Sequence, residues 1–219
     1  MTLRSALRLL PVVVLAALAL AACGRSATPA KFETNDITGV GWGGDFRLVD
    51  PEGSARSLAD YRGKVVMLFF GYTNCPDACP TALAKMAQTV DRLGADGSRV
   101  QGLFVTLDPA RDAAEVLKRY VPAFHPSFVG LSADPDTIAS TAKAFKLFYE
   151  AQKPDANGFY TVDHSSAIFV FDPSGRLRLF FGSQTEVEAM VHDVKLLLNQ
   201  ADAQDRAQAP APNEAFAAK

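Results

Sequence analysis

Residues 64–80 read KVVMLFFGYTNCPDACP. The run from Lys64 to Tyr72 is apolar almost throughout, which is the pattern of a strand with both faces covered. Beyond Pro80, apolar residues recur at the three- and four-residue spacing of a helix, at Leu83, Met86, Val90 and Leu93. The stretch therefore predicts a buried strand that leads, through two cysteines four positions apart, into an amphipathic helix.

The segments on either side alternate between strand and helix patterns. Residues 45–50 alternate polar and apolar side chains before the turn residues 51–53, which indicates a β-hairpin. The further expected strands are 101–107, 128–131, 167–171 and 177–181. The further expected helices are 112–120, with Asp112 as candidate N-cap, 135–149 and 185–198. This order of a β-hairpin, a βαβ unit, an αβα insertion and a ββα unit predicts an α/β protein, and the placement of the cysteines makes the prediction a thioredoxin-like fold.

The composition is that of one folded domain with flanking segments. The chain has 219 residues, 48% of them hydrophobic and 21% charged, so it can bury enough apolar surface to offset the entropy lost on folding. Its formal net charge of −2 gives no attraction to polyanions, so we expect no nucleic-acid partner. We expect the domain over residues 41–200, a tether over 23–40 and a disordered Ala/Gln/Pro-rich tail over 201–219.

The first 22 residues have the features of a targeting segment. Arg4 and Arg8 precede an apolar run, Leu9 to Ala22, which as a helix spans about 21 Å, short of a hydrocarbon core of roughly 30 Å. We therefore interpret residues 1–22 as a signal peptide. The end of this run, Leu-Ala-Ala-Cys23, resembles a bacterial lipobox, so we expect a membrane lipoprotein acylated at Cys23. Ordinary cleavage that leaves Cys23 unmodified is the alternative.

Cys75 and Cys79 lie where the buried strand leads into the helix. The unpaired N–H groups and partial positive charge of a helix N-terminus favour a thiolate over a thiol. A spacing of four places both sulfur atoms on one face of the first helical turn. The pair can therefore bind a metal ion or exchange disulfides, and a purely structural disulfide is the alternative.

Two distant residues are expected at the same edge of the sheet. Asp108 follows a strand parallel to the first, so both strands exit at the carboxyl edge. His164 precedes the strand 167–171, which runs antiparallel to the first and so begins at that edge. Topology thus brings His164, and with it Asp108, to Cys75 and Cys79. Two thiolates and an imidazole suit copper, as Cu(I) or Cu(II), and zinc can use the same ligands.

Several of these polar residues have simpler explanations. Asp108 can turn the chain before Pro109. Asp77, which lies between the two cysteines in the sequence, can cap the helix instead of adjusting the properties of a metal or redox site. His125 and His192 are expected to lie away from this edge of the sheet.

Three ordered blocks resemble the Sco/SenC family of copper-binding assembly proteins. They are FFGYTNCPDACP (69–80), VTLDPARD (105–112) and VDHSS (162–166). The resemblance covers about residues 45–198 and implies a thioredoxin-like domain that is tethered to the membrane and faces the periplasm.

This resemblance also implies a metal and a partner. It implies copper bound by Cys75, Cys79 and His164, and a role in maturing the binuclear copper centre of cytochrome c oxidase subunit II. Family members are credited with metal delivery, with reduction of the target's cysteines, or both. A metallochaperone is the first expectation, and a thiol–disulfide oxidoreductase that uses Cys75 and Cys79 is the alternative.

Overall fold

A six-stranded mixed sheet forms the centre of the protein, in the computed structural model that describes residues 31–208. The strand order is β1-β10-β9-β4-β5-β6. These strands are β1 (Asn35–Asp36), β4 (Val65–Gly71), β5 (Val100–Thr106), β6 (Val129–Leu131), β9 (Ile168–Phe171) and β10 (Leu177–Phe181). Two separate hairpins pair β2 (Leu48–Val49) with β3 (Ala55–Arg56), and β7 (Tyr149–Ala151) with β8 (Val162–His164).

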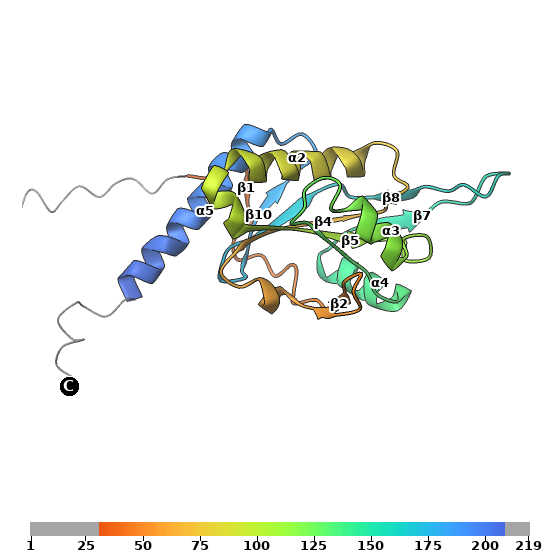
Figure 1. Ribbon diagram of the computed structural model, residues 1–219, viewed down its shortest axis with the longest axis horizontal. Helices are drawn as coiled ribbons and strands as arrows, with labels where there is room; N and C mark the ends of the chain where they lie inside the picture. The colour runs from red at the N-terminus through yellow and green to blue at the C-terminus, as the bar shows by residue number, and fades with distance from the viewer. Residues whose placement is uncertain (1–30, 209–219) are drawn as a thin grey trace, which may run out of the picture. The chain divides into compact units, whose positions relative to one another are not determined.

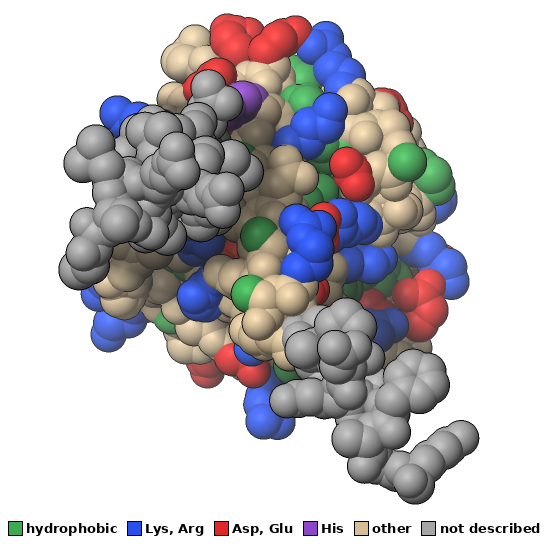
Figure 2. Space-filling view, turned by 90° about the vertical axis from the view of Figure 1, so that its left-hand side faces the viewer, with side chains coloured by type: hydrophobic (Ala, Val, Ile, Leu, Met, Phe, Trp, Pro, Cys, Tyr) green, Lys and Arg blue, Asp and Glu red, His purple; other side chains and the backbone are tan. Residues whose placement is uncertain are grey.

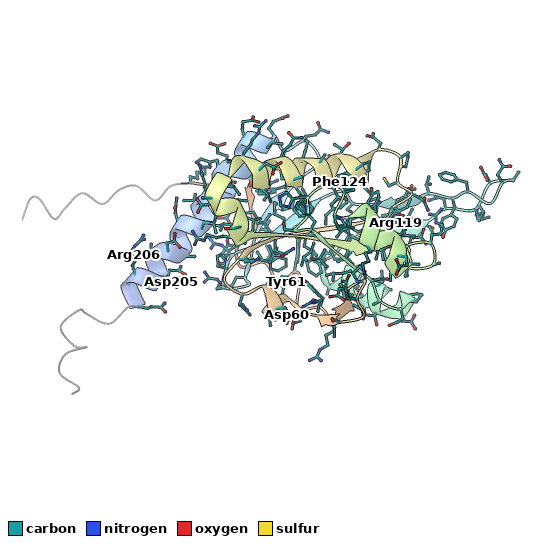
Figure 3. The ribbon with its side chains drawn as sticks, in the orientation of Figure 1. Asp60, Tyr61, Arg119, Phe124, Asp205 and Arg206 are labelled. Atoms are coloured by element: carbon teal, nitrogen blue, oxygen red, sulfur yellow. The ribbon has the colours of Figure 1, made fainter. Side chains whose placement is uncertain are left out.

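Helices cover both faces of the sheet (Figure 1). The helices are α2 (Ala78–Arg92), α3 (Ala114–Tyr120), α4 (Pro135–Ala144) and α5 (Val187–Gln208), with two short 3-10 helices, η1 (Leu58–Tyr61) and η2 (Gly94–Arg99). α2 and α5 lie together over one face, while α4 and the β2–β3 hairpin lie on the other. Figure 3 labels Phe124 and Tyr61, which pack against the hydrophobic core from opposite sides of the sheet.

β4 lies inside the sheet and positions the segment that follows it. It pairs in parallel with β5 and antiparallel with β9. Every residue of β4 and β5 is buried, and for this reason both strands read as continuous apolar runs rather than as alternating patterns. The predicted α/β class is confirmed, with its N-terminal hairpin β2–β3 and the inserted α3-β6-α4 unit.

The helix predicted over residues 135–149 is shorter in the structure. α4 begins where the Asp134 carboxylate accepts a hydrogen bond from the backbone N–H of Thr137 at 3.0 Å. Soon after the helix ends, Lys146 adopts a φ of +54°, a left-handed conformation that a continuing helix excludes. The chain then forms β7, whose partner β8 carries His164, in a hairpin that the residue pattern does not predict (Figure 1).

The tether predicted over residues 23–40 is wrong for its last part. β1 pairs antiparallel with β10 at the edge of the sheet. The buried Asp193 carboxylate of α5 accepts hydrogen bonds from the backbone N–H groups of Glu33 and Thr34, both at 2.9 Å. The Thr34 hydroxyl donates to the same carboxylate at 2.6 Å. These bonds fasten the segment to the domain before residue 41.

The disordered tail predicted from residue 201 is also wrong for its first part, because α5 continues to Gln208. An ion pair between Arg99 and Asp202 ties this extension to η2. Figure 2 shows basic side chains interspersed with acidic ones on the face that it displays. Residues 209–219 lie outside the described part of the chain.

The expected targeting segment is not part of the described structure. Residues 1–30, with the predicted signal peptide and Cys23, lie outside it. Within residues 31–208, no helix combines the length and the hydropathy that crossing a bilayer requires.

Candidate metal centre

Cys75 and Cys79 lie at the N-terminal end of α2, just after β4. Cys75 precedes the helix and Cys79 lies in its first turn. The backbone N–H of Cys79 donates a hydrogen bond to the Sγ of Cys75 at 3.4 Å. An N–H group in this position has no partner within the helix, and its bond stabilises negative charge on the sulfur. Both residues are free thiols, Cys79 fully buried and Cys75 partly exposed.

Gly71, the last residue of β4, makes room for the buried thiol. A Cβ atom built at this position would lie 2.8 Å from the Sγ of Cys79 and 2.8 Å from the ring of Phe69. Those separations are shorter than van der Waals contact, so any larger residue at position 71 would displace one of them. The missing side chain of a glycine is therefore a condition for the Cys79 sulfur to lie where it does.

His164 reaches the same place from the β7–β8 hairpin. Its Nε2 atom lies 3.5 Å from the Sγ of Cys79. Its Nδ1 atom lies 2.9 Å from the backbone oxygen of Val162. Because a carbonyl oxygen only accepts, Nδ1 carries the proton and the lone pair of Nε2 points toward the sulfur. This is the tautomer in which a histidine binds a metal through Nε2 while its other nitrogen is held by the backbone.

Two aromatic rings fix the orientation of the imidazole. The Tyr72 ring meets that of His164 edge-on, with centroids 5.8 Å apart and planes at 77°. The Phe69 ring lies 6.2 Å away at 66°. Tyr72 and Phe69 are both buried, so the imidazole lies against a rigid apolar wall at the end of β4.

The buried thiol is held in its neutral form in the metal-free protein. Burial raises the pKa of Cys79 well above its usual range, and the neighbouring Cys75 thiol raises it further. Burial likewise raises the pKa of the Tyr72 phenol. A metal ion that binds Cys79 must therefore displace its proton.

The separation of sulfur and nitrogen fits a shared metal ion. Two donors bound to one tetrahedral ion, with bonds of about 2.3 Å to sulfur and about 2.0 Å to nitrogen, lie about 3.5 Å apart. The 3.5 Å between Cys79 and His164 matches that value. Within residues 31–208, however, no three His, Cys, Asp or Glu side chains are already arranged around one point that could hold an ion. A three-ligand site therefore needs a side-chain movement, and Cys75 is the partly exposed candidate.

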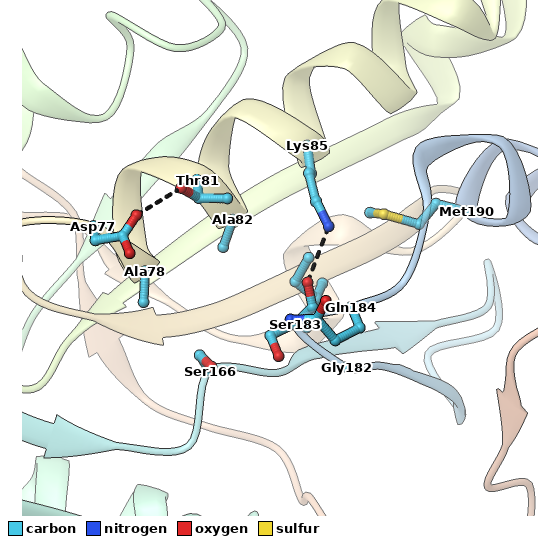
Figure 4. A pocket seen from close by; sticks show the side chains of 11 residues that line it. Asp77, Ala78, Thr81, Ala82, Lys85, Ser166, Gly182, Ser183, Gln184 and Met190 are labelled. Atoms are coloured by element: carbon cyan, nitrogen blue, oxygen red, sulfur yellow. Dashed lines mark hydrogen bonds between the residues drawn. The ribbon is translucent and has the colours of Figure 1, made fainter.

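Asp77 lies between the cysteines but does not cap the helix through its side chain. Its carboxylate accepts a hydrogen bond from the Thr81 hydroxyl at 3.4 Å. Both side chains line a cavity of about 170 Å³ between α2 and the segment that joins β10 to α5 (Figure 4). Lys85 closes the other side, because its Nζ donates to the backbone oxygens of Ser183, at 2.9 Å, and Thr185, at 3.0 Å. The side-chain cap that Asp77 could have provided is therefore absent among the described contacts.

Asp108 follows β5, as predicted, and is buried. Its Oδ1 accepts a hydrogen bond from the Tyr160 hydroxyl at 2.9 Å, and its Oδ2 accepts one from the Nε of Arg111. Sequence reasoning missed both partners. Arg111 lies inside the block at 105–112, so a signal was present, whereas nothing in the sequence marks Tyr160.

Asp112 has a different role from the predicted one. α3 begins at Ala114 with Ala113 at the N-cap position, so the prediction that Asp112 caps this helix is wrong. The buried carboxylate instead accepts hydrogen bonds from the Thr106 hydroxyl, at 2.6 Å, and from Thr73, whose hydroxyl lies at 2.5 Å and whose backbone N–H lies at 3.0 Å. Asp112 thus ties the turn that carries Cys75 to the end of β5.

The other two histidines have partners elsewhere. His125 contacts the Ser127 hydroxyl at 2.8 Å and the Asp91 carboxylate at 3.7 Å. His192, on α5, contacts the Asp193 carboxylate at 2.8 Å. Neither described set of contacts includes a thiol, so His164 is the histidine that the fold delivers to the cysteines.

The chain resembles known proteins over most of this domain. The SCO1/SenC family model matches residues 36–199. The mouse protein named "Protein SCO2 homolog, mitochondrial" is 38% identical over 154 residues, which are 69% of this chain and 60% of that protein. The chain thus spans 60% of the length of this curated relative.

Solved structures give the same picture. The structure of Bradyrhizobium japonicum ScoI with copper bound has a TM-score of 0.64 and 35% identity, covering 70% of this chain and 98% of that one. The structure of BsSco, described as a member of the Sco family of cytochrome c oxidase assembly proteins, has a TM-score of 0.60 and 22% identity, covering 76% of this chain and 97% of that one. This second likeness supports the fold alone. The thioredoxin-like fold, predicted from the order of segments and the placement of the cysteines, is confirmed by these neighbours.

Proposed function

Because the chain belongs to the SCO1/SenC family, we propose that it is a metallochaperone that binds copper through Cys75, Cys79 and His164. The observation that carries this proposal is the 3.5 Å approach of the His164 Nε2 to the Cys79 Sγ. A structural disulfide needs no imidazole, whereas a metal site needs donors of this kind at this separation. The Bradyrhizobium relative, described with copper bound, supports copper rather than zinc as the metal.

Cys75, Cys79 and His164 offer different donor atoms to copper. Thiolate sulfur is the preferred ligand of Cu(I), and an imidazole nitrogen added to it also accommodates Cu(II). Cys79 and His164 are buried or packed against aromatic rings and form the fixed part of the site. Cys75 is partly exposed, so exchange of copper with a donor or an acceptor begins at its sulfur.

The redox state of the cysteines controls loading. A Cys75–Cys79 disulfide has no thiolate to offer, since its formation removes two electrons and two protons from the pair. The reduced pair is therefore the form that takes up copper. Stoichiometric uptake of copper by the disulfide form would contradict this part of the proposal.

The place of action and the target come from the resemblance. Acylation of Cys23 would hold the domain at the membrane, with the folded part in the periplasm. The resemblance to Sco/SenC proteins points to cytochrome c oxidase subunit II, whose binuclear copper centre would receive the metal.

Metal analysis of the reduced full-length protein tests the function directly. We expect about one copper per chain, and loss of this copper in a Cys75→Ser, Cys79→Ser double variant. Cys23→Ser is the matched control, since it makes the same chemical change outside the site. It should keep the copper and lose membrane attachment. Copper content of the double variant equal to that of the wild type would refute the proposal.

The hydrogen bond from the Cys79 N–H to the Cys75 Sγ favours a second candidate, a thiol–disulfide oxidoreductase. The stabilised Cys75 thiolate would attack one sulfur of a target disulfide and release the other as a thiolate. Cys79 would then lose its proton, attack the Cys75 sulfur and release the second target thiolate, leaving a Cys75–Cys79 disulfide. His164, 3.5 Å from Cys79, can accept that proton.

A copper-free reductase assay separates the two candidates. If copper delivery is the role of this site, His164→Ala should reduce an oxidised target at the wild-type rate while its Cu(II) affinity falls. If thiol exchange is the role and His164 is its base, the same variant should slow reduction about 100-fold or more.

A further inference from the structure

A partly buried polar cluster lies beside the site, and none of its described hydrogen bonds involves a thiol. It consists of Asp108, Arg111 and Tyr160, which we call the Tyr160 cluster. The Asp108 carboxylate is shared, since one oxygen accepts from the Tyr160 hydroxyl at 2.9 Å and the other from the Arg111 Nε. Asp108 is 5% exposed, while Arg111 and Tyr160 are partly buried, so both charge-assisted hydrogen bonds are partly shielded from water.

Tyr160 is bound at three points. Besides the bond from its hydroxyl, its backbone oxygen accepts a hydrogen bond from the Nη1 of Arg111 at 2.9 Å. The guanidinium carbon of Arg111 also lies 3.5 Å from the centroid of the Tyr160 ring, a stacked cation–π contact. Hydroxyl, ring face and backbone are thus all fastened to the turn that follows β5.

The chain runs directly from Tyr160 to the imidazole. Val162 follows two residues later, and its backbone oxygen accepts the hydrogen bond from the Nδ1 of His164. Among the strands of residues 31–208, β8 pairs with β7 and not with the central sheet. The central sheet therefore does not align β8 by backbone hydrogen bonds, and side-chain contacts with the rest of the domain must do so.

The cluster also borders the aromatic wall of the site. The guanidinium carbon of Arg111 lies 5.7 Å from the centroid of the Tyr72 ring. The Tyr72 ring in turn meets the imidazole of His164 edge-on. Arg111 thus contacts both the segment that leads into β8, at Tyr160, and the Tyr72 ring against which the histidine packs.

We propose that Asp108, Arg111 and Tyr160 are positioning residues, which align β8 so that the His164 imidazole meets the thiol pair. The inference rests on the proposed function, because it takes His164 to be a copper ligand. It implies that Cu(II), which needs the imidazole, depends on the cluster more strongly than Cu(I), which two thiolates hold. Groups that orient a metal-binding histidine change metal affinity by about 10–100-fold when they are removed.

Two substitutions of different severity test this in the full-length chain. Tyr160→Phe removes one hydroxyl and keeps the ring under Arg111. Asp108→Asn keeps the shape of the side chain and removes its charge. We expect the Cu(II) affinity to fall about tenfold in Tyr160→Phe and up to about 100-fold in Asp108→Asn, with the Cu(I) affinity changed less than about threefold. The nitrogen hyperfine pattern of the Cu(II) electron paramagnetic resonance spectrum should weaken in the same order.

A metal-free readout accompanies the affinities. In the reduced apo protein, hydrogen exchange of the backbone amides at residues 161–165 should accelerate in both variants, while β4 and β5 keep their protection. A general loss of stability would instead raise exchange in all of these strands together.

Asp172→Asn is the matched control. Like Asp108, Asp172 is buried, with 4% of its surface exposed. Its carboxylate forms ion pairs with two arginines, Arg176 at 2.9 Å and Arg178 at 3.1 Å. It lies just after β9, at the opposite end of that strand from His164. This variant should be less stable than the wild type and yet bind Cu(II) with unchanged affinity.

The outcomes distinguish this inference from the function on which it rests. Unchanged exchange at residues 161–165 in both variants overturns the positioning role, and so does a wild-type Cu(II) affinity in both when His164→Ala has lost affinity. A His164→Ala variant that itself binds Cu(II) like the wild type overturns the proposed ligand set instead.

Discussion

The imidazole Nε2 of His164 lies 3.5 Å from the thiol sulfur of Cys79, although 85 positions separate the two residues in the chain. β4 delivers the cysteine into the first turn of α2, and β9, antiparallel to β4, begins at the edge where β4 ends. The hydrogen bond from His164 to Val162 turns the unprotonated nitrogen toward the sulfur. This contact brings a thiol sulfur and an imidazole nitrogen together in a mostly buried site. The four predictions below concern this contact and the residues that surround it.

Removal of the imidazole should separate the two oxidation states of copper. In His164→Ala we expect the Cu(II) affinity to fall more than about 100-fold and the Cu(I) affinity to fall less than about tenfold. The Cu(II) loss should exceed the loss caused by removing a group that only orients a metal ligand. Competition titrations with chelators specific for each ion measure both constants. His125→Ala is the control, since His125 contacts Ser127 and Asp91, and it should leave both constants unchanged. Equal losses for the two ions would argue against an imidazole ligand.

Addition of a methyl group at Gly71 should disturb the thiol and the fold together. The added Cβ would lie 2.8 Å from the Cys79 sulfur and 3.0 Å from the Phe104 ring, so Gly71→Ala overpacks the core. We expect a loss of about 1–3 kcal/mol in the free energy of unfolding, together with reduced copper affinity. Thermal unfolding and copper titration measure the two effects. Gly44→Ala adds a methyl group where nothing lies within 4 Å and should change neither.

The raised pKa of Cys79 makes the stability of the reduced apo protein depend on alkaline pH. Burial keeps the thiol protonated in the folded state, while in the unfolded chain it ionises near its ordinary pKa of about 8.5. The folded state then binds more protons than the unfolded state, so the stabilisation is complete below about pH 8.5 and declines above it, by up to about 1.4 kcal/mol per pH unit. Denaturant unfolding under reducing conditions between pH 8.5 and 9.5 gives the slope. Cys79→Ala should flatten it, and an identical slope in that variant would show that other groups are responsible.

Loss of the Thr73 hydroxyl should loosen the turn that carries Cys75. This hydroxyl donates to the buried Asp112 carboxylate at 2.5 Å. We expect Thr73→Val to lower the free energy of unfolding by about 1–3 kcal/mol and to accelerate alkylation of Cys75. Thr137→Val is the control, because its hydroxyl donates to Asp134 at 2.6 Å at the start of α4. The control should lose stability without any change in the alkylation rate; a change in both variants alike would exclude a local effect on the turn.

The strands and helices of the central domain follow from local residue patterns. β4 and β5 lie inside the sheet and are buried on both faces, so their apolar runs identify them without reference to the rest of the chain. The cysteine pair at the start of α2 can be recognised in the same way, because a strand ends just before it and a helical pattern follows.

Several boundaries and roles could not be predicted in this way. The segment 33–36 reads as a tether, yet Asp193 and β10 hold it to the domain through contacts between residues 143 to 160 positions apart in the chain. Asp112 is of a residue type that often caps helices, but its carboxylate instead accepts hydrogen bonds from the hydroxyls of Thr73 and Thr106. The helix 135–149 ends early because Lys146 takes a left-handed conformation, which no residue pattern indicates for a lysine.

By itself, the amino-acid sequence determined the α/β class and the order of the elements, because the periodicity of apolar residues is a local property. It also determined that Cys75, Cys79 and His164 lie at the same edge of the sheet, because strand directions follow from the order of the elements. Only the tertiary structure decided the contacts at that edge. These are the 3.5 Å contact of Cys79 with His164, the packing of the Cys79 sulfur against Gly71, and the hydrogen bonds of Asp108 and Arg111 with Tyr160. Those contacts depend on rotamers and on the path of a hairpin outside the central sheet, which are set by the packing of groups far apart in the chain.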